Sequence, residues 1–263
     1  MKTKLIFAAA LIVCSCSHVN NDLEKYGLNC KVREISVQSD TLEYSYEVFF
    51  NPEGQVELMN RYNFDGTFRY KEVYTYDNSG HLSEIQGVNA ENETEVRYEY
   101  DWDGAFISEC RLFGMNNEEL HRWVHHNDGR HIVRTEYYAE GVLSYVTLKQ
   151  FSGNGYDEES IDEEEEVVLG RAHVDFLTED KPTRIRSDAV NVEVDYNDAG
   201  LPVRSKGTVL NSLGEMQWVA DLEEHPERFY TYEYDKRGNW ISRAEKVHPD
   251  STVVAVLRRT IIY

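Results

Sequence analysis

The sequence has few basic residues and no long apolar stretch after its first dozen or so positions. Lysine and arginine together number 27, against 48 aspartates and glutamates, so the formal charge is −21 at pH 7. A polyanionic surface repels phosphate backbones, which excludes nucleic acid as a partner. The apolar run from Leu5 to Val13 is shorter than the roughly 20 residues that a membrane-spanning helix needs. Beyond its start, the chain therefore reads as soluble.

Cysteine is equally scarce. Two of the four cysteines, Cys14 and Cys16, stand near the start, and only Cys30 and Cys110 follow. Small disulfide scaffolds need several pairs, so this class of protein is excluded. In an oxidising compartment Cys30 and Cys110 could form one disulfide, and their unknown separation in space leaves this open.

The motifs of common enzyme classes are also missing. There is no Gly-x-Ser-x-Gly elbow, no P-loop and no dinucleotide fingerprint. The chain has one histidine cluster, formed by His121, His125, His126 and His131. On a strand, His125 and His126 would point to opposite sides, and no cysteine or carboxylate partner has the spacing of a zinc ligand. We predict no metal, no cofactor and no catalytic residue.

The first fifteen residues are typical of a signal peptide, because Lys2 and Lys4 precede the apolar run. The following segment Val13-Cys14-Ser15-Cys16 resembles a lipobox, the signal at which bacterial lipoproteins are cleaved and acylated. The resemblance implies that Cys16 is the lipidation site; Cys14 is the alternative, although Val13 is large for the position before it. Lipoproteins retained at the inner membrane have an aspartate after the cysteine, where this chain has Ser17. An outer-membrane lipoprotein, facing the periplasm or the cell surface, is therefore expected.

One phrase recurs along the mature chain, consisting of two tyrosines around one residue, then Asp or Asn, then glycine three positions later. Gly54, Gly80, Gly104 and Gly129 end successive copies at a spacing of about 25 residues, typical of stacked supersecondary units. The clearest copies are Tyr74-Thr75-Tyr76-Asp77-Asn78-Ser79-Gly80, Tyr98-Glu99-Tyr100-Asp101-Trp102-Asp103-Gly104, Val194-Asp195-Tyr196-Asn197-Asp198-Ala199-Gly200 and Tyr232-Glu233-Tyr234-Asp235-Lys236-Arg237-Gly238.

Each copy predicts a β-hairpin. Residues two positions apart share one face of a strand, so Tyr98 and Tyr100 lie on one face while Arg97 and Glu99 lie on the other. The Asp or Asn accepts a hydrogen bond from the backbone two residues later and starts the turn. The glycine supplies the positive φ with which the chain re-enters as the partner strand.

The phrase resembles the YD repeat of RHS-type proteins, over about residues 44–245. That resemblance implies a long antiparallel β-meander that winds into a spiral or a shell. The copies ending at Gly80, Gly104 and Gly238 fit best, and the middle of the chain departs from the pattern. Family members can enclose a C-terminal toxin, but only about 25 residues follow the last copy here, too few for a toxin domain.

We therefore predict an all-β fold with 16–18 short strands, in which residues 16–40 form a lipid-anchored linker and residues 41–263 form the repeat domain. Because neighbouring strands twist by about 20–25°, the single sheet should be strongly twisted or spiral. Open sheets beyond about ten strands often split, so we expect a split into two lobes near residues 153–170. The C-terminal strand Val253 to Tyr263 could pair with a partner unless it closes the sheet.

An acidic insertion near residues 156–166 interrupts the repeats. Clustered carboxylates bind Ca²⁺, but consecutive acids lack the alternating spacing and glycine pivot of a calcium loop. Blocks of like charge repel one another, so a solvated insertion without metal is the simpler interpretation. The segment Asp101-Trp102-Asp103-Gly104 also resembles part of a calcium loop, but the repeat turn already accounts for it.

The aromatic residues are the remaining candidates for a binding surface. Tyrosines pack well on a sheet that is partly exposed to solvent, because the ring is buried while the hydroxyl forms hydrogen bonds with water. Alternatively, one aromatic face binds a protein or stacks on sugar rings, with Trp102, Trp123, Trp218 and Trp240 as the candidate contacts. We predict a non-catalytic envelope lipoprotein that binds or acts as a scaffold. The alternatives are a surface glycan-binding module and, less favoured, a hydrolase using carboxylates such as Asp175 or Asp195.

Overall fold

The computed structural model describes residues 22–40, 44–63, 65–162, 164–178, 181–187, 191–210, 216–218, 227–247 and 253–263. The predicted signal peptide and the predicted lipidation site at Cys16 lie outside these residues. The described chain is all-β and antiparallel, which confirms that part of the sequence prediction. Its strands are β1 Glu34–Ser39, β2 Tyr44–Phe50, β3 Val56–Asn63, β4 Phe68–Tyr76, β5 Leu82–Asn89, β6 Thr94–Asp103, β7 Phe106–Phe113, β8 Glu119–Asn127, β9 Ile132–Ala139, β10 Val142–Ser152, β11 Gly155–Asp162, β12 Val167–Thr178, β13 Lys181–Ser187, β14 Asn191–Tyr196, β15 Pro202–Lys206, β16 Thr208–Leu210, β17 Met216–Trp218, β18 Arg228–Tyr234, β19 Trp240–Lys246 and β20 Val253–Ile262.

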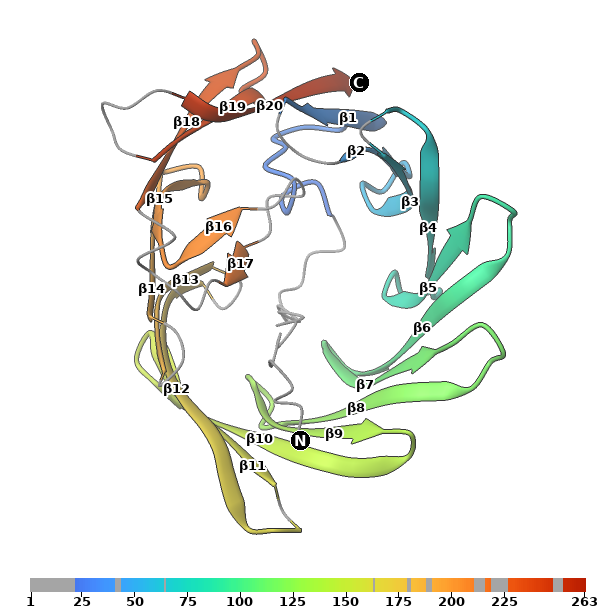
Figure 1. Ribbon diagram of the computed structural model, residues 1–263, viewed down its shortest axis with the longest axis vertical. Helices are drawn as coiled ribbons and strands as arrows, with labels where there is room; N and C mark the ends of the chain where they lie inside the picture. The colour runs from blue at the N-terminus through green and yellow to red at the C-terminus, as the bar shows by residue number, and fades with distance from the viewer. Residues whose placement is uncertain are drawn as a thin grey trace.

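The sheet closes on itself as an 18-stranded barrel. From β1 to β15 each strand pairs with the next along the chain, β15 pairs with β18, β18 pairs with β19, and β20 pairs with both β19 and β1 (Figure 1). Ile35 of β1 lies opposite Val48 of β2 on one side and opposite Ile261 of β20 on the other. The hairpin of β16 and β17 forms a separate sheet drawn inside the ring.

Closure corrects the predicted open, spiral or two-lobed sheet. The twist that we expected to coil the sheet instead brings β20 back to β1, as barrel formation requires of a tilted, staggered sheet. The expected split near residues 153–170 is also wrong, because β11 pairs along its length with β10 and β12. The acids from Asp157 to Asp162 thus lie in a barrel strand, and Glu164 to Glu166 lie in the turn after it.

The recurring phrase forms the turns that we predicted. At the β4–β5 connection, the backbone N–H groups of Ser79 and His81 both donate to the Asp77 carboxylate at 2.8 Å. Gly80 has a φ of 84° and donates to the Asp77 carbonyl at 3.0 Å. These backbone donors, that of His81 foremost, lower the pKa of Asp77. The β18–β19 turn repeats the geometry with Asp235 and Gly238.

Alternate residues of each strand form two different walls. One wall carries mostly aliphatic and aromatic side chains, as in the facing pairs Val48–Met59, Tyr98–Leu112 and Trp123–Tyr137. Residues 22–33 pack against this wall and lie inside the ring in Figure 1, so it is the inner wall. The opposite, outer wall carries charged residues, such as Glu99 facing Arg111 and Glu159 facing Arg171.

We expected residues 22–33 to be part of a linker, but they pack into the core inside the barrel. We call them the N-terminal plug. Leu23 and Leu28 join the buried core with Ile35, Val37 and Val48 of the inner wall. Residues 34–39 likewise form β1 of the barrel, although we had assigned them to the linker.

A buried arginine of β20, Arg259, also holds the plug to the inner wall. Nη1 of Arg259 donates to the carbonyl of Tyr26 at 2.8 Å, and its guanidinium lies 3.8 Å from the centroid of the Trp240 ring. Burial lowers the pKa of Arg259 to about 10. Within the described residues, no helix is both long and apolar enough to cross a membrane.

Candidate functional site

A series of aromatic side chains follows the inner wall from β6 to β12, in separate groups of contacting rings. Strand alternation places them there, because each one faces another inner-wall residue across the sheet. All except Tyr156 are only half-buried. We call this series the aromatic row; it consists of Trp102, His121, Trp123, Tyr137, Tyr145, Phe151, Tyr156 and Phe176.

The centre of the row is a cluster on β8, β9 and β10. The Tyr137 ring lies 5.5 Å from Trp123 and 4.8 Å from Tyr145, measured between ring centroids. Its hydroxyl lies 2.8 Å from Nδ1 of His121, within hydrogen-bond distance. Burial raises the pKa of Tyr137 and of Tyr145, so both phenols remain protonated and neutral at neutral pH.

Polar side chains lie beside the row on the same wall. Nδ1 of His125 is 2.9 Å from the Thr135 hydroxyl, and Lys149 lies 4.6 Å above the Tyr156 ring and 3.6 Å from the Glu158 carboxylate. Burial lowers the pKa of His125 to about 4, and the nearby charge of Lys149 adds to the effect. His125 is therefore neutral at neutral pH.

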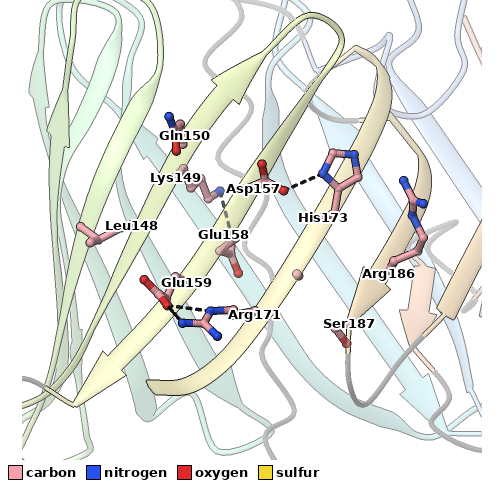
Figure 2. A pocket seen from close by; sticks show the side chains of 11 residues that line it. Leu148, Lys149, Gln150, Asp157, Glu158, Glu159, Arg171, His173, Arg186 and Ser187 are labelled. Atoms are coloured by element: carbon pink, nitrogen blue, oxygen red, sulfur yellow. Dashed lines mark hydrogen bonds and ion pairs between the residues drawn. The ribbon is translucent and has the colours of Figure 1, made fainter. Parts of the chain in front are cut away.

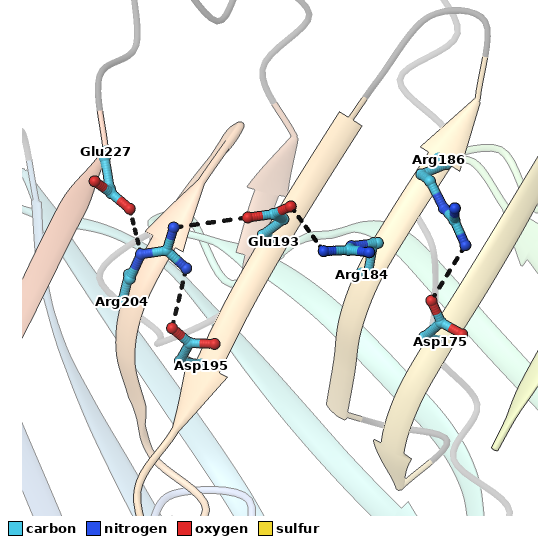
Figure 3. A network of polar contacts seen from close by, with 7 residues as sticks. All are labelled: Asp175, Arg184, Arg186, Glu193, Asp195, Arg204 and Glu227. Carbon is cyan, nitrogen blue, oxygen red and sulfur yellow. Dashed lines mark hydrogen bonds and ion pairs between the residues drawn. The ribbon is translucent and has the colours of Figure 1, made fainter.

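The outer wall of β12 to β15 carries a network of ion pairs (Figure 3). Arg204 contacts Asp195 at 3.0 Å and Glu193 at 3.6 Å, and it also pairs with Glu227. Arg184 pairs with Glu193 at 3.0 Å. Figure 3 draws these side chains on the near side of the strands, with the opposite wall of the barrel behind them. Cross-strand charges on this wall therefore pair mainly with one another.

A hollow of about 770 Å³ lies over β10 to β13 (Figure 2). His173 links two carboxylates there, with Nδ1 2.7 Å from Asp157 and Nε2 3.3 Å from Asp175. The hydrogen bond to Asp157 is the main cause that raises the pKa of His173. Arg186 adds a contact of 3.5 Å to Asp175.

The predicted hydrolase carboxylates lie in a second hollow, of about 570 Å³, which both Asp175 and Asp195 line. Each is already engaged with a guanidinium: Asp175 with Arg186, and Asp195 with Arg204. A glycosidase pair requires one protonated carboxyl group beside one charged carboxylate. Both Asp175 and Asp195 have the contacts of structural ion pairs.

The four candidate tryptophans do not form one exposed line. Trp102 and Trp123 lie half-buried in the aromatic row, where Trp102 stacks on His81 at 4.6 Å and donates to the Leu82 carbonyl at 2.8 Å. Trp240 is 8% exposed and packs beside the plug. Trp218 lies in β17, and its side chain is outside the described part of the structure.

The remaining candidates are placed as follows. Cys30 lies beside Asn239 at the β18–β19 turn, whereas Cys110 lies in β7 between Tyr100 and Trp123 of the neighbouring strands. The two cysteines, whose pairing the sequence left open, are not joined by a disulfide. His125 and His126 face opposite walls as predicted, since His126 contacts Glu136 at 3.1 Å on the outer wall. Among the described residues, no three His, Cys, Asp or Glu side chains are grouped to hold a metal ion.

Sequence reasoning missed His121, Tyr137 and Tyr145 as parts of the aromatic row. They lie outside clear copies of the repeated phrase, and only the register between strands brings them together. The alternation of Thr135, Tyr137 and Ala139 was a usable signal for Tyr137, because these residues share one face of β9.

No family model and no curated protein matches this sequence. Among solved structures, the chain is similar to a porin-like protein from Bacteroides uniformis ATCC 8492, with 9% identity and a TM-score of 0.42, covering 88% of this chain and 97% of that one. A porin-like protein from Bacteroides vulgatus ATCC 8482 has 8% identity and a TM-score of 0.33, covering 87% and 97%. The Photorhabdus luminescens Tc holotoxin pore has 10% identity and a TM-score of 0.31, covering 81% of this chain but 12% of that one.

Proposed function

We propose that this chain is an envelope lipoprotein, anchored at the outer membrane through Cys16, that binds a partner or acts as a scaffold and does not catalyse a reaction. The observation that carries the proposal is the aromatic row, a series of half-buried rings along the inner wall of a closed barrel. Rings of this kind offer large contact areas at low entropic cost and concentrate binding energy.

The outer wall supports a barrel that stands at the membrane surface. Barrels that span a membrane present an apolar band about 25 Å tall to lipid. Here the strands from β12 to β15 instead carry Arg184, Glu193, Asp195 and Arg204 outward, in mutual ion pairs. An anchor formed by an acylated Cys16 is consistent with this wall and with the lipobox resemblance of the N-terminus.

The anchor is tested by expressing the full chain with an alkyne fatty acid in the medium. Label should enter the wild type and should be lost in Cys16→Ala, with the protein moving from the membrane to the soluble fraction. If Cys16→Ala stays labelled and membrane-bound while Cys14→Ala does not, Cys14 is the anchor. Absence of label from the wild type would contradict the proposed lipoprotein.

The binding surface is tested with Tyr137→Ala, which opens the centre of the aromatic row, and with Tyr138→Ala as the matched control on the outer wall of the same strand. Purified wild type is screened against envelope glycans and envelope proteins by change in tryptophan fluorescence. We expect binding that weakens at least tenfold in Tyr137→Ala, about 1.4 kcal/mol, and little in Tyr138→Ala. Equal affinities for the two variants would contradict a partner on the inner wall.

A glycan is the second candidate partner, because Trp102 and Trp123 both lie half-buried on the inner wall. Aromatic faces stack on the apolar faces of sugar rings. Trp123→Ala should then abolish binding to the glycan found in the screen, whereas Trp218→Ala, in the separate hairpin, should leave it unchanged. A screen that finds protein ligands alone would remove this candidate.

A further inference from the structure

The hairpin connections of the barrel alternate between its two ends. One end, which we call the turn mouth, collects the turns of the recurring phrase, and the other, the acidic mouth, collects the connections between copies. Antiparallel pairing of consecutive strands imposes this alternation. The described turns of the turn mouth are 51–55, 77–81, 104–105, 128–131, 153–154, 197–201 and 235–239, and the described parts of the acidic mouth are 40, 65–67, 90–93, 114–118, 140–141, 164–166, 207, 227 and 247.

The N-terminal plug is fixed to the turn mouth at two points. Asp22 donates its backbone N–H to the Gly54 carbonyl at 2.9 Å, and its carboxylate accepts from the Val56 N–H at 2.9 Å and from the Tyr76 hydroxyl at 3.0 Å. Farther along the plug, Asn29 donates its side-chain amide to the Gly238 carbonyl at 2.6 Å. The first described residue of the chain is thus held at the turn mouth.

The chain between Asp22 and the proposed anchor is short. Six residue steps separate Cys16 from Asp22, and a fully extended chain spans at most about 3.6 Å per step, or roughly 20 Å. Strands of about eight residues at 3.3 Å per residue give a wall of similar height. The tether can therefore bring the turn mouth to the membrane in many conformations, whereas it would have to be almost fully extended along the whole wall to present the acidic mouth there.

The charges of the two mouths favour the same orientation as the tether does. The described connections of the acidic mouth contain no lysine or arginine, and their ten carboxylates are Asp40, Asp65, Glu91, Glu93, Glu118, Glu140, Glu164, Glu165, Glu166 and Glu227. The described turns of the turn mouth balance five acids with three cations: Glu53, Asp77, Asp128, Asp198 and Asp235 against Arg130, Lys236 and Arg237. An anionic lipid surface repels the acidic mouth within a Debye length of about 8–10 Å.

From the tether and the charges together, we propose that the barrel stands on an anionic lipid surface with its turn mouth facing the lipid headgroups and its acidic mouth facing away. The proposal rests on the lipid anchor of the proposed function. It makes the acidic mouth the end that is presented to soluble partners.

The test attaches the anchor chemically, so that its result does not depend on acylation in cells. The mature chain beginning at Cys16, with Cys30→Ser and Cys110→Ala, is coupled through Cys16 to a maleimide phospholipid in vesicles of phosphatidylglycerol and phosphatidylcholine. A fluorophore is placed through an encoded azido-phenylalanine at the exposed Asn78 of the turn mouth or at Met115, which is 61% exposed, of the acidic mouth. Lipids with a nitroxide on the headgroup then quench whichever fluorophore lies near the membrane.

We expect several-fold stronger quenching at position 78 than at position 115. Equal quenching, or stronger quenching at position 115, would overturn the proposed orientation. Inserting a flexible linker of about 20 residues after Cys16 lengthens the tether to an average span of about 25 Å and should reduce the difference. If cells do not acylate Cys16 but the coupled protein still shows stronger quenching at position 78 than at position 115, the proposed lipid anchor is wrong. The proposed orientation of the barrel on an anionic surface then still holds.

Discussion

The inner and outer walls are made of alternate residues of the same strands, yet different interactions hold them. On the inner wall around β1 to β3, buried aliphatic side chains pack against the plug, and Ile35 and Val48 are fully buried. On the outer wall of β12 to β15, partly exposed charges pair across strands. Burial of apolar area contributes far more to stability than exposed ion pairs do, so the inner wall should dominate the free energy of unfolding.

The largest expected effect is the loss of a buried side chain where the plug meets the inner wall. Ile35→Ala removes buried methyl groups and leaves a cavity, so it should lower the free energy of unfolding by roughly 2–5 kcal/mol in urea denaturation. The neighbouring Ser36→Ala, on the outer wall of the same strand, should change it by less than about 0.5 kcal/mol. Similar losses of unfolding free energy in both variants would contradict the claim that the inner wall contributes most of the stability.

A smaller effect should come from pH on the inner wall. Because the pKa of His125 is about 4 in the folded state, against an ordinary histidine value of 6.5 in the unfolded chain, the unfolded chain binds more protons between these values. Stability should therefore fall as pH drops from 6.5 towards 4, by up to about 3 kcal/mol at full protonation.

This pH dependence is measured as the slope of unfolding free energy against pH between 7 and 5. The slope should flatten in His125→Gln and remain in His126→Gln, whose histidine lies on the outer wall. A slope that survives in His125→Gln would assign the effect to other groups.

Next in size is the hydrogen bond that fixes the plug to β4. Tyr76→Phe removes a hydroxyl that donates to Asp22 and contacts the Val56 carbonyl at 2.8 Å, within a desolvated site that raises the pKa of Tyr76. We expect a loss of about 1.5 kcal/mol, as for hydrogen bonds to charged groups. Hydrogen exchange should also speed up at the N–H of Asp22 and Val56, and unchanged exchange there would contradict the role of Tyr76 in holding the plug.

The smallest effect should appear in the outer ion-pair network. Arg204→Gln should cost less than about 1 kcal/mol, because partly exposed pairs are screened by solvent. The difference from wild type should shrink further in 1 M salt, where the Debye length is about 3 Å. A loss as large as that of Ile35→Ala would show that the outer wall carries the stability.

Local structure could be predicted from the sequence, but closure of the barrel could not. The Asp77 and Asp235 turns follow from side-chain chemistry within five residues, and the alternation of Tyr98 with Glu99 fixes two walls. Closure depends on the six-residue strand Glu34–Ser39 meeting a strand more than 200 positions away, which no local pattern encodes. That is why β1 was assigned to the linker and the sheet was expected to remain open.

The aromatic row could be predicted only in part for a similar reason. Trp102 and Trp123 were identified as candidates by residue type, whereas their neighbours depend on register across β8, β9 and β10, including a bulge between Leu143 and Tyr145. The plug could not be anticipated, because Leu23 and Leu28 show no strand or helix periodicity and gain their place through tertiary contacts with Ile35 and Val48.

Closure between the first and last strands is the central claim, and a disulfide across that seam tests it most directly. Ser36 of β1 and Thr260 of β20 lie opposite each other, and facing residues of antiparallel strands have Cα atoms about 4.5–5.5 Å apart, suitable for a disulfide. In a Cys30→Ser, Cys110→Ala background, Ser36→Cys with Thr260→Cys should form this bond on mild oxidation, read by mass spectrometry. Ser36→Cys with Ser242→Cys, two strands apart and offset by two residues, at about 12 Å, should not. Failure of the first pair to link in folded protein, or equal linking of both pairs, would contradict the closed barrel.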